Sequence, residues 1–210
     1  MFKSVVDNNK KKGSYQLALS DLKRKRTHYI MNSGFIEKYI MVTLQLGTLA
    51  GLVYRLGHGV HTLSFAPLRG LLLLPYLILN FLVCGLTGIG IRRETKIGEG
   101  FIIHNFSAIL IDAQQIGKNF TINQGVSVGP DWRNNGRPTI GDNVYLGSGT
   151  KVLGAVTIGN NVVVGANALV ERSIPDDCTV VGVPARIIVR GGDSEYLRLK
   201  AASGESPRAA

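Results

Sequence analysis

The chain has 210 residues, of which 45% are hydrophobic, and it carries 24 Lys and Arg against 14 Asp and Glu. This length allows one domain with a core and a small helical part, and little more. The 26 Gly and only 7 Pro exclude a collagen-like or disordered chain and indicate a regular structure that uses glycine. Cys84 and Cys178 form neither a disulfide framework nor a Cys-x-x-Cys metal site, so we expect a reduced, cytoplasmic compartment.

Residues 1–30 are expected to form a basic, partly disordered arm. They hold eight of the 24 cations and two of the 14 anions. Neither interleaved aromatic residues nor a binding module points to a nucleic acid as partner. Clustered Lys and Arg beside apolar helices are attracted to anionic membrane surfaces, so the arm is either solvated or in contact with such a surface.

Residues 31–87 are predicted to be an α-helical, apolar lead-in. Its first apolar segment, 39–54, is too short to span a bilayer without strain, whereas 70–91 is formally long enough. The end of the second segment is Gly-rich and typical of a helix exit, and the remaining helix is interrupted by Pro75 and Asn80. It suits burial between subunits or the membrane interface as well as it suits a span. We favour burial or a peripheral contact at the inner membrane face, and we recognise no secretory signal.

From Ile91 onward, aliphatic residues recur with a period of six. A helix would show a period of 3.6 and a plain strand a period of two, so short strands joined by tight corners explain the pattern better. Three such hexads close a triangular coil, and stacked coils form a parallel β-helix in which each coil buries its neighbour's face. The aliphatic positions are Ile91, Ile97, Ile103, Ile109, Ile116, Ile122, Val128, Ile140, Leu146, Val152, Ile158, Val164 and Val170.

The β-helix is predicted over residues 88–189, followed by a C-terminal tail at 190–210. The spacing from Val128 to Ile140 is twelve residues, and position 134 between them is not aliphatic. We therefore interpret residues 129–139 as a loop that leaves the coil. A long insertion in an otherwise strict solenoid is usually functional.

The stretch 95–189 resembles the left-handed β-helix hexapeptide acyltransferases, and within them the serine acetyltransferase-like group. The resemblance rests on the segments TKIGEGFIIHNFSAILID, INQGVSVG, PTIGDNVYLGSGTKVLGAVTIGNNVVVGANALV and VVGVPARII. With the lead-in that contains YRLGH, the chain looks most similar to polysaccharide and capsule O-acetyltransferases. The resemblance implies acetyl transfer from acetyl-CoA to a hydroxyl, in a homotrimer whose active sites lie between neighbouring β-helices.

A hydroxyl becomes a good nucleophile when a positioned base takes its proton, and imidazole titrates near neutral pH. Of the four histidines, His104 alone lies in the repeat, so it is the leading candidate base. The catalytic histidine of the family matches Asn105 instead. The carboxylate that orients it matches Gly90, and the nearest acid is Glu94. The base is therefore His104, Asn105 or a residue of a neighbouring chain, unless His104 only caps a corner of the solenoid.

A donor groove for pantetheine needs little side-chain bulk, which Gly and Ala corners provide. By resemblance, the CoA channel and the contact to its phosphates are assigned to Gly147, Ser148, Gly149, Ala166 and Arg186. Each glycine is explained equally well as a turn residue. In the inserted loop, Arg137 stands where the family has a second histidine. Trp132 and Arg137 could bind a charged or planar part of the substrate, or form a solvated loop tip.

We expect an enzyme, an O-acetyltransferase that acts on a sugar of a surface polysaccharide or its lipid-linked precursor. Serine O-acetyltransferase is one alternative, against which stand the short N-terminal region and two replacements. By resemblance, His104 stands where serine acetyltransferases carry an acceptor-binding carboxylate, and Arg137 stands where they carry the loop histidine. A non-catalytic trimeric scaffold is another, favoured by Gly90 and Asn105. A γ-type carbonic anhydrase shares the β-helix but needs three histidines on its metal, so we expect no metal.

Overall fold

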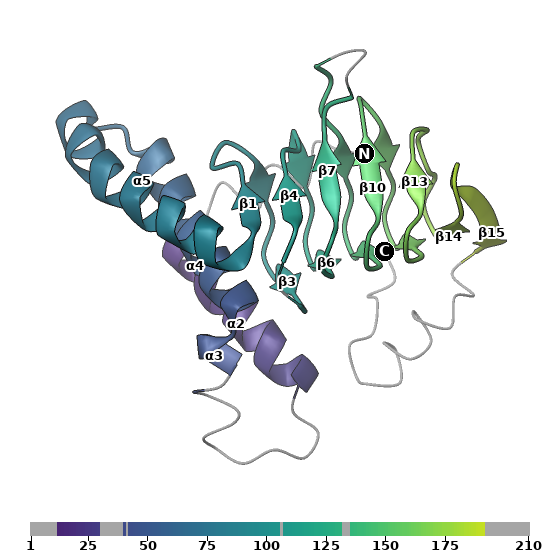
Figure 1. The fold of residues 1–210 in the computed structure, drawn as a ribbon, viewed down its shortest axis with the longest axis horizontal. Helices are drawn as coiled ribbons and strands as arrows, with labels where there is room; N and C mark the ends of the chain where they lie inside the picture. The colour runs from purple at the N-terminus through teal and green to yellow at the C-terminus, as the bar shows by residue number, and fades with distance from the viewer. Residues whose placement is uncertain (1–11, 30–39, 41, 106, 132–134, 192–210) are drawn as a thin grey trace.

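The structure is a computed structural model that describes residues 12–29, 40, 42–105, 107–131 and 135–191. Helices lie at one end of a parallel β-helix, which is the N-terminal end of the solenoid (Figure 1). In chain order they are α2 (Ser14–Tyr29), α3 (Val42–Leu44), α4 (Leu46–Thr62) and α5 (Ala66–Thr87).

Three sheets form the sides of the β-helix, and each coil passes from sheet A to sheet B to sheet C. Sheet A contains β1 (Ile89–Ile91), β4 (Ile109–Ile111), β7 (Ser127–Gly129), β10 (Lys151–Leu153) and β13 (Leu169–Val170). Sheet B contains β2 (Lys96–Ile97), β5 (Gln115–Ile116), β8 (Thr139–Ile140) and β11 (Thr157–Ile158). Sheet C contains β3 (Ile102–Ile103), β6 (Thr121–Ile122), β9 (Tyr145–Leu146), β12 (Val163–Val164), β14 (Cys178–Val181) and β15 (Arg186–Arg190). The predicted hexapeptide β-helix with an N-terminal helical region is confirmed.

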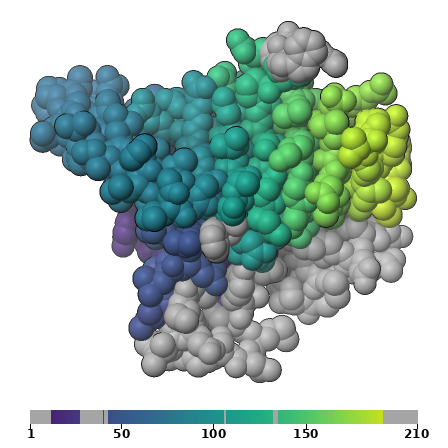
Figure 2. Space-filling model, viewed as in Figure 1, coloured from purple at the N-terminus to yellow at the C-terminus, as the bar shows by residue number. Residues whose placement is uncertain are grey.

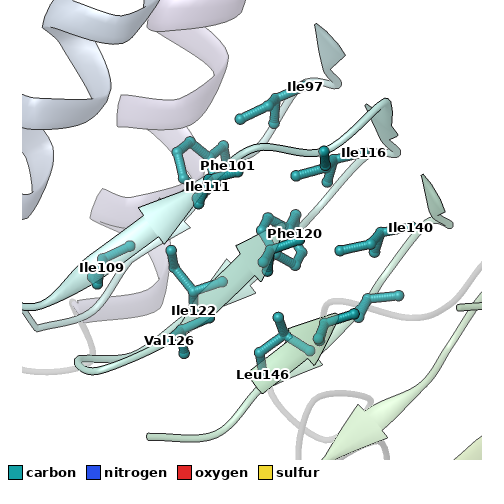
Figure 3. Packing of buried hydrophobic residues seen from close by; sticks show 14 of the residues in the cluster. Ile97, Phe101, Ile109, Ile111, Ile116, Phe120, Ile122, Val126, Ile140 and Leu146 are labelled. Atoms are coloured by element: carbon teal, nitrogen blue, oxygen red, sulfur yellow. The ribbon is translucent and has the colours of Figure 1, made fainter. Parts of the chain in front are cut away.

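The core of the solenoid is built from the aliphatic residue of each hexad, which points into the coil (Figure 3). Ile97, Ile116 and Ile140 are register partners in successive coils, so like side chains stack on like. The rings of Phe101 and Phe120 stack at 5.8 Å between centroids. The repeat therefore produces a continuous column of buried apolar side chains, which drives folding.

A ladder of amides runs along the corner between sheets B and C. Asn119, Asn143 and Asn161 adopt left-handed φ values of 55°, 57° and 55°, which Asn tolerates better than most residues. Each Nδ2 donates to the Oδ1 of the next coil, over 3.0 Å from Asn119 and 2.9 Å from Asn143 and Asn161, the last acceptor being Asp177. The ladder satisfies polar groups at the turn and sets the register of the coils.

The first coil has no coil before it, so its outer edge needs other partners for its backbone groups. The guanidinium of Arg55, only 2% exposed, donates to the carbonyl oxygens of Ile97 at 2.7 Å and Gly98 at 2.6 Å. Asp21 pairs with Arg55 Nε at 2.8 Å and accepts from the amide of Phe101 at 2.8 Å. Helices α2 and α4 thus cap the β-helix with buried charged groups.

Helix α2 adds a second cation to this cap. Lys25, 3% exposed, donates to the carbonyl of Ile103 at 2.8 Å and to Thr48 Oγ1 at 2.7 Å. Burial lowers the pKa of Lys25 to about 8. Within the expected basic arm, residues 14–29 are therefore helical and packed, because the open edge of the solenoid offers acceptors for their cations. Residues 1–11 lie outside the described part.

Candidate functional site

The corners between sheets C and A line up as one edge, which we call the C–A edge: residues 104–105, 107–108, 123–125, 147–149 and 165–167. Backbone hydrogen bonds join its levels. The amide of Gly125 donates to Ser107 at 3.0 Å, and that of Gly149 donates to Gln124 at 2.9 Å. Likewise, the amide of Asn167 donates to Ser148 at 2.8 Å. Residues far apart in sequence are thereby stacked in one row.

His104 and Asn105 occupy the first level of the C–A edge. The His104 side chain is half-buried, and its backbone amide donates to Ile122 at 2.9 Å. Asn105 is exposed, and its Nδ2 donates to Gln124 Oε1 at 3.0 Å. Gln124, which the sequence analysis missed, therefore positions the amide of Asn105. Gln124 and Ser148 hold the same position in successive coils, so counting hexads from Ser148 could have identified Gln124.

The backbone of the first level is strained. Ala108, with φ of 52°, aligns through the strand register with Gly125, whose φ is 72°. The same place one coil later is held by Gly149, with φ of 74°. Ser107 precedes Ala108 with φ of 99°. Left-handed conformations cost residues other than Gly and Asn about 1–2 kcal/mol, and such strain clusters at functional sites.

The residues assigned to the CoA channel lie higher on the same edge. A Cβ on Gly147 would lie 2.7 Å from the amide nitrogen of Ala166, so stacking of the coils requires glycine there whatever it binds. Ser148 is half-buried and Ala166 is exposed. Adjacent levels are about 4.8 Å apart, which puts His104 and Ala166 about 14 Å apart along the edge.

Two cations flank this row. The amide of Ala185 donates to Leu169 at 2.8 Å, which brings exposed Arg186 to the last level of the edge. Lys151 Nζ donates to the Gly125 carbonyl at 2.6 Å and to Ser127 Oγ at 3.0 Å. The sequence analysis missed Lys151, although it closes the Gly147–Gly149 corner in the SGTK segment.

The corner between sheets A and B, the A–B edge, holds a charged cluster. Arg137 Nε donates to Asp112 Oδ1 at 2.6 Å, and Arg92 donates to Asp112 Oδ2 at 3.1 Å. Glu94 accepts from Arg92 at 3.2 Å and from Arg93 at 3.0 Å. Three guanidinium groups thus meet two carboxylates. The loop residue Trp132 lies outside the described residues.

Sheet A separates the two edges, so Glu94 and Arg137 lie away from His104 of the same chain. Glu94 is engaged by arginines and does not orient His104. At Gly90, an added Cβ would lie 3.1 Å from Leu110 Cδ2 of the neighbouring strand, so Leu110 occupies the space beside it. Among the described residues, no cluster of three His, Cys, Asp or Glu could hold a metal ion.

Known proteins with similar sequences are bacterial hexapeptide-repeat transferases and serine acetyltransferases. Residues 137–172 match the family model "Bacterial transferase hexapeptide (six repeats)". A serine acetyltransferase of Synechococcus elongatus is 41% identical over 110 residues, 51% of this chain and 45% of that protein. One of Staphylococcus aureus is 43% identical over 109 residues, 50% of this chain and 51% of that protein. The chain thus spans about half the length of these relatives.

Solved structures agree with the fold. The serine acetyltransferase of Brucella abortus strain S19 superimposes with a TM-score of 0.69 at 23% identity, covering 92% of this chain and 75% of that one. The expected similarity to polysaccharide O-acetyltransferases, and with it the expected sugar or polysaccharide acceptor, is wrong, because these relatives are serine acetyltransferases. The two groups share the hexad, so the repeat itself did not separate them. The chain carries the left-handed, hexapeptide-repeat β-helix of the bacterial transferases, with serine acetyltransferases among its relatives.

Proposed function

We propose that the chain is an acetyl-CoA-dependent O-acetyltransferase whose acceptor is serine. One observation carries the proposal: His104, Asn105 and the small residues of the later corners lie in a single row on the C–A edge. A row of exposed backbone and small side chains fits a thin, amide-bearing donor, and Arg186 at its end suits the phosphates.

In the proposed reaction, the imidazole of His104 takes the proton of the serine hydroxyl as its oxygen attacks the thioester carbonyl. The amide of Asn105, fixed by Gln124 at 3.0 Å, suits the developing oxyanion or the imidazole. Collapse of the tetrahedral intermediate forms the ester and expels the CoA sulfur, which receives the proton from His104. The products are O-acetylserine and free CoA.

The active unit is a trimer in this proposal. Arg137 lies on the A–B edge, on the far side of sheet A from His104, so one chain cannot place both at one substrate. In a ring of three chains, the A–B edge of one chain faces the C–A edge of its neighbour. The three arginines against two carboxylates leave this cluster with a net positive charge, which suits the serine carboxylate.

The proposal is tested by following thiol release from acetyl-CoA with and without serine, with mass spectrometry of the product. We expect serine-dependent thiol release and O-acetylserine. Thiol release that ignores serine would overturn the assignment of the acceptor, and no release with any acceptor would leave the scaffold alternative. Sedimentation at micromolar concentration tests the oligomer, and a strict monomer contradicts it.

A further inference from the structure

Helix α5 exposes an apolar surface that the proposed reaction does not use. Among the helices of the described residues, only α5 is long and apolar enough to cross a bilayer. Of its most apolar 18-residue stretch, 17% is buried. Ten of its Leu, Ile and Phe side chains are exposed. The most exposed are Leu71 at 73%, Leu74 at 65%, Phe81 at 76% and Leu86 at 73%.

The buried side of α5 is narrow. Tyr76, Val83 and Thr87 are its buried residues and lie on one face, where the ring of Tyr76 packs against Gly57 of α4. At about 100° per residue, the exposed apolar side chains cover more than half of the circumference. This surface projects from the N-terminal end of the β-helix (Figure 2).

A soluble monomer rarely carries an apolar patch of this extent, so a partner must cover it. A second protein helix would cover only an arc of about 100° of the α5 circumference, the usual width of the apolar face of an amphipathic helix. Lipid chains cover an apolar arc of any width. From Gly70 to Thr87 the helix has no charged residue, and exposed Arg69 in its first turn can reach phosphate headgroups.

We infer that α5 inserts its exposed apolar face into one leaflet of a phospholipid bilayer without crossing it. Both helices of the α4–α5 hairpin are tied to the β-helix. Arg55 of α4 is bonded to Ile97 and Gly98, and the Ile89 amide of β1 donates to Thr87 Oγ1 of α5 at 3.2 Å. A helix is about 10–12 Å thick with its side chains, which fits half of a hydrocarbon core of about 30 Å. The helix therefore holds the β-helix at the membrane surface.

The test is flotation of the full chain with vesicles of phosphatidylcholine alone and of phosphatidylcholine mixed with phosphatidylglycerol. We expect binding to both, since burial of leucines does not require anionic lipid. The combined change Leu74→Glu and Phe81→Glu should lower the partition coefficient about 100-fold or more, because each fully buried large side chain contributes about 1.5–3 kcal/mol. These side chains are exposed in the structure, so the variant should fold, which circular dichroism checks.

The matched control combines Leu44→Glu and Ile188→Glu, two exposed apolar residues at 69% and 59% outside α5. This control should bind vesicles like the unchanged chain. The inference is overturned if the unchanged chain stays with the soluble fraction, or if both double variants bind equally. It is also overturned if lipid-free chains associate through α5. In that case the Leu74→Glu, Phe81→Glu variant would have a lower mass in sedimentation than both the unchanged chain and the control variant. In that case a second copy covers the helix.

Discussion

The first coil of the β-helix and the coils that follow it share one hexad but differ in what surrounds them. A coil inside the stack lies between two others. Glycine corners let it pack closely against them, and the Asn119–Asn161 ladder forms hydrogen bonds to them. The first coil has a coil on one side only, and Arg55, Lys25 and Asp21 cover the other. It also carries the strained corner with His104. The candidate catalytic residues therefore lie in the terminal coil of the repeat, the one that packs against helices α2 and α4 instead of against another coil.

The largest effect should come from the corner of the first coil. His104→Asn should lower kcat by about 10² to 10⁴, the usual contribution of a general base, while the affinity for acetyl-CoA stays nearly unchanged. The donor groove is built from other corners, so a split between kcat and KM is expected. Steady-state kinetics with acetyl-CoA and serine measure it, and His61→Asn, an exposed residue of α4, is the control.

Asn105→Ala should cost less, about 10-fold to 10³-fold, as expected for an amide that donates to the oxyanion or holds the imidazole. If Asn105→Ala abolishes turnover while His104→Asn retains it, the base is not His104. That result would move the base to a neighbouring chain.

Arg55→Met should destabilise the protein by about 3–5 kcal/mol, because Asp21 would be left as an uncompensated buried charge. The two carbonyls of the first coil would also lose their donors. The free energy of unfolding from denaturant titration measures the loss. Arg69→Met removes an exposed arginine and should change stability by less than about 0.5 kcal/mol. Equal effects of the two variants would show that the cap is not what holds the first coil.

In the later coils, Asn143→Ala should cost about 2–5 kcal/mol. The alanine must keep the left-handed φ of 57°, which costs about 1–2 kcal/mol, and two ladder hydrogen bonds are lost. Asn143→Gly loses the same hydrogen bonds without the strain, so it should be less destabilising. A reversed order of the two variants would mean that backbone strain does not decide this corner.

A further effect concerns the pH dependence of the free energy of unfolding, through the cap. The pKa of Lys25 is about 8 in the folded protein and about 10.5 when unfolded, because burial disfavours its charge. Between these values the unfolded chain binds a proton that the folded chain has released, so the free energy of unfolding rises with pH. Denaturant titrations from pH 7 to 10.5 should show this rise, and Lys25→Met should lack it. Parallel profiles would contradict a buried, titrating Lys25.

The sequence predicted the repeating part of the fold and little of what surrounds it. The aliphatic hexad locates most of the coils, because one inward residue per strand is a requirement that each coil repeats. In the second coil the register partner of Ile91 and Val128 is Ile111 rather than the predicted Ile109. The same pattern predicted a loop at residues 129–139, but both ends of that range belong to strands, because β7 ends at Gly129 and β8 begins at Thr139. Arg55 and Lys25 were not predicted to be buried, because a long cationic side chain gives no sign in sequence of which carbonyl it will reach.

The candidate site was predicted unevenly for a similar reason. His104 was singled out by its place in the repeat, whereas the residues at 147–149 and 166 were assigned by resemblance to the family. Two hydrogen bonds of the site join side chains of different coils: Asn105 to Gln124, and Arg137 to Asp112. The spacing of the hexads does not determine such side-chain contacts. The proposed acceptor rests on the relatives rather than on the repeat.

The last strand has a consequence for self-assembly. A parallel solenoid that ended on a bare strand would offer a template on which the next molecule could add, head to tail, into a fibre. Here β15 turns back and pairs antiparallel with β14, and Arg186 and Arg190 are exposed at its two ends. A parallel strand arriving at sheet C would meet β15 running in the opposite direction, so β15 covers this edge of sheet C. Removal of 186–210 should turn a discrete particle into one whose scattered light rises with time.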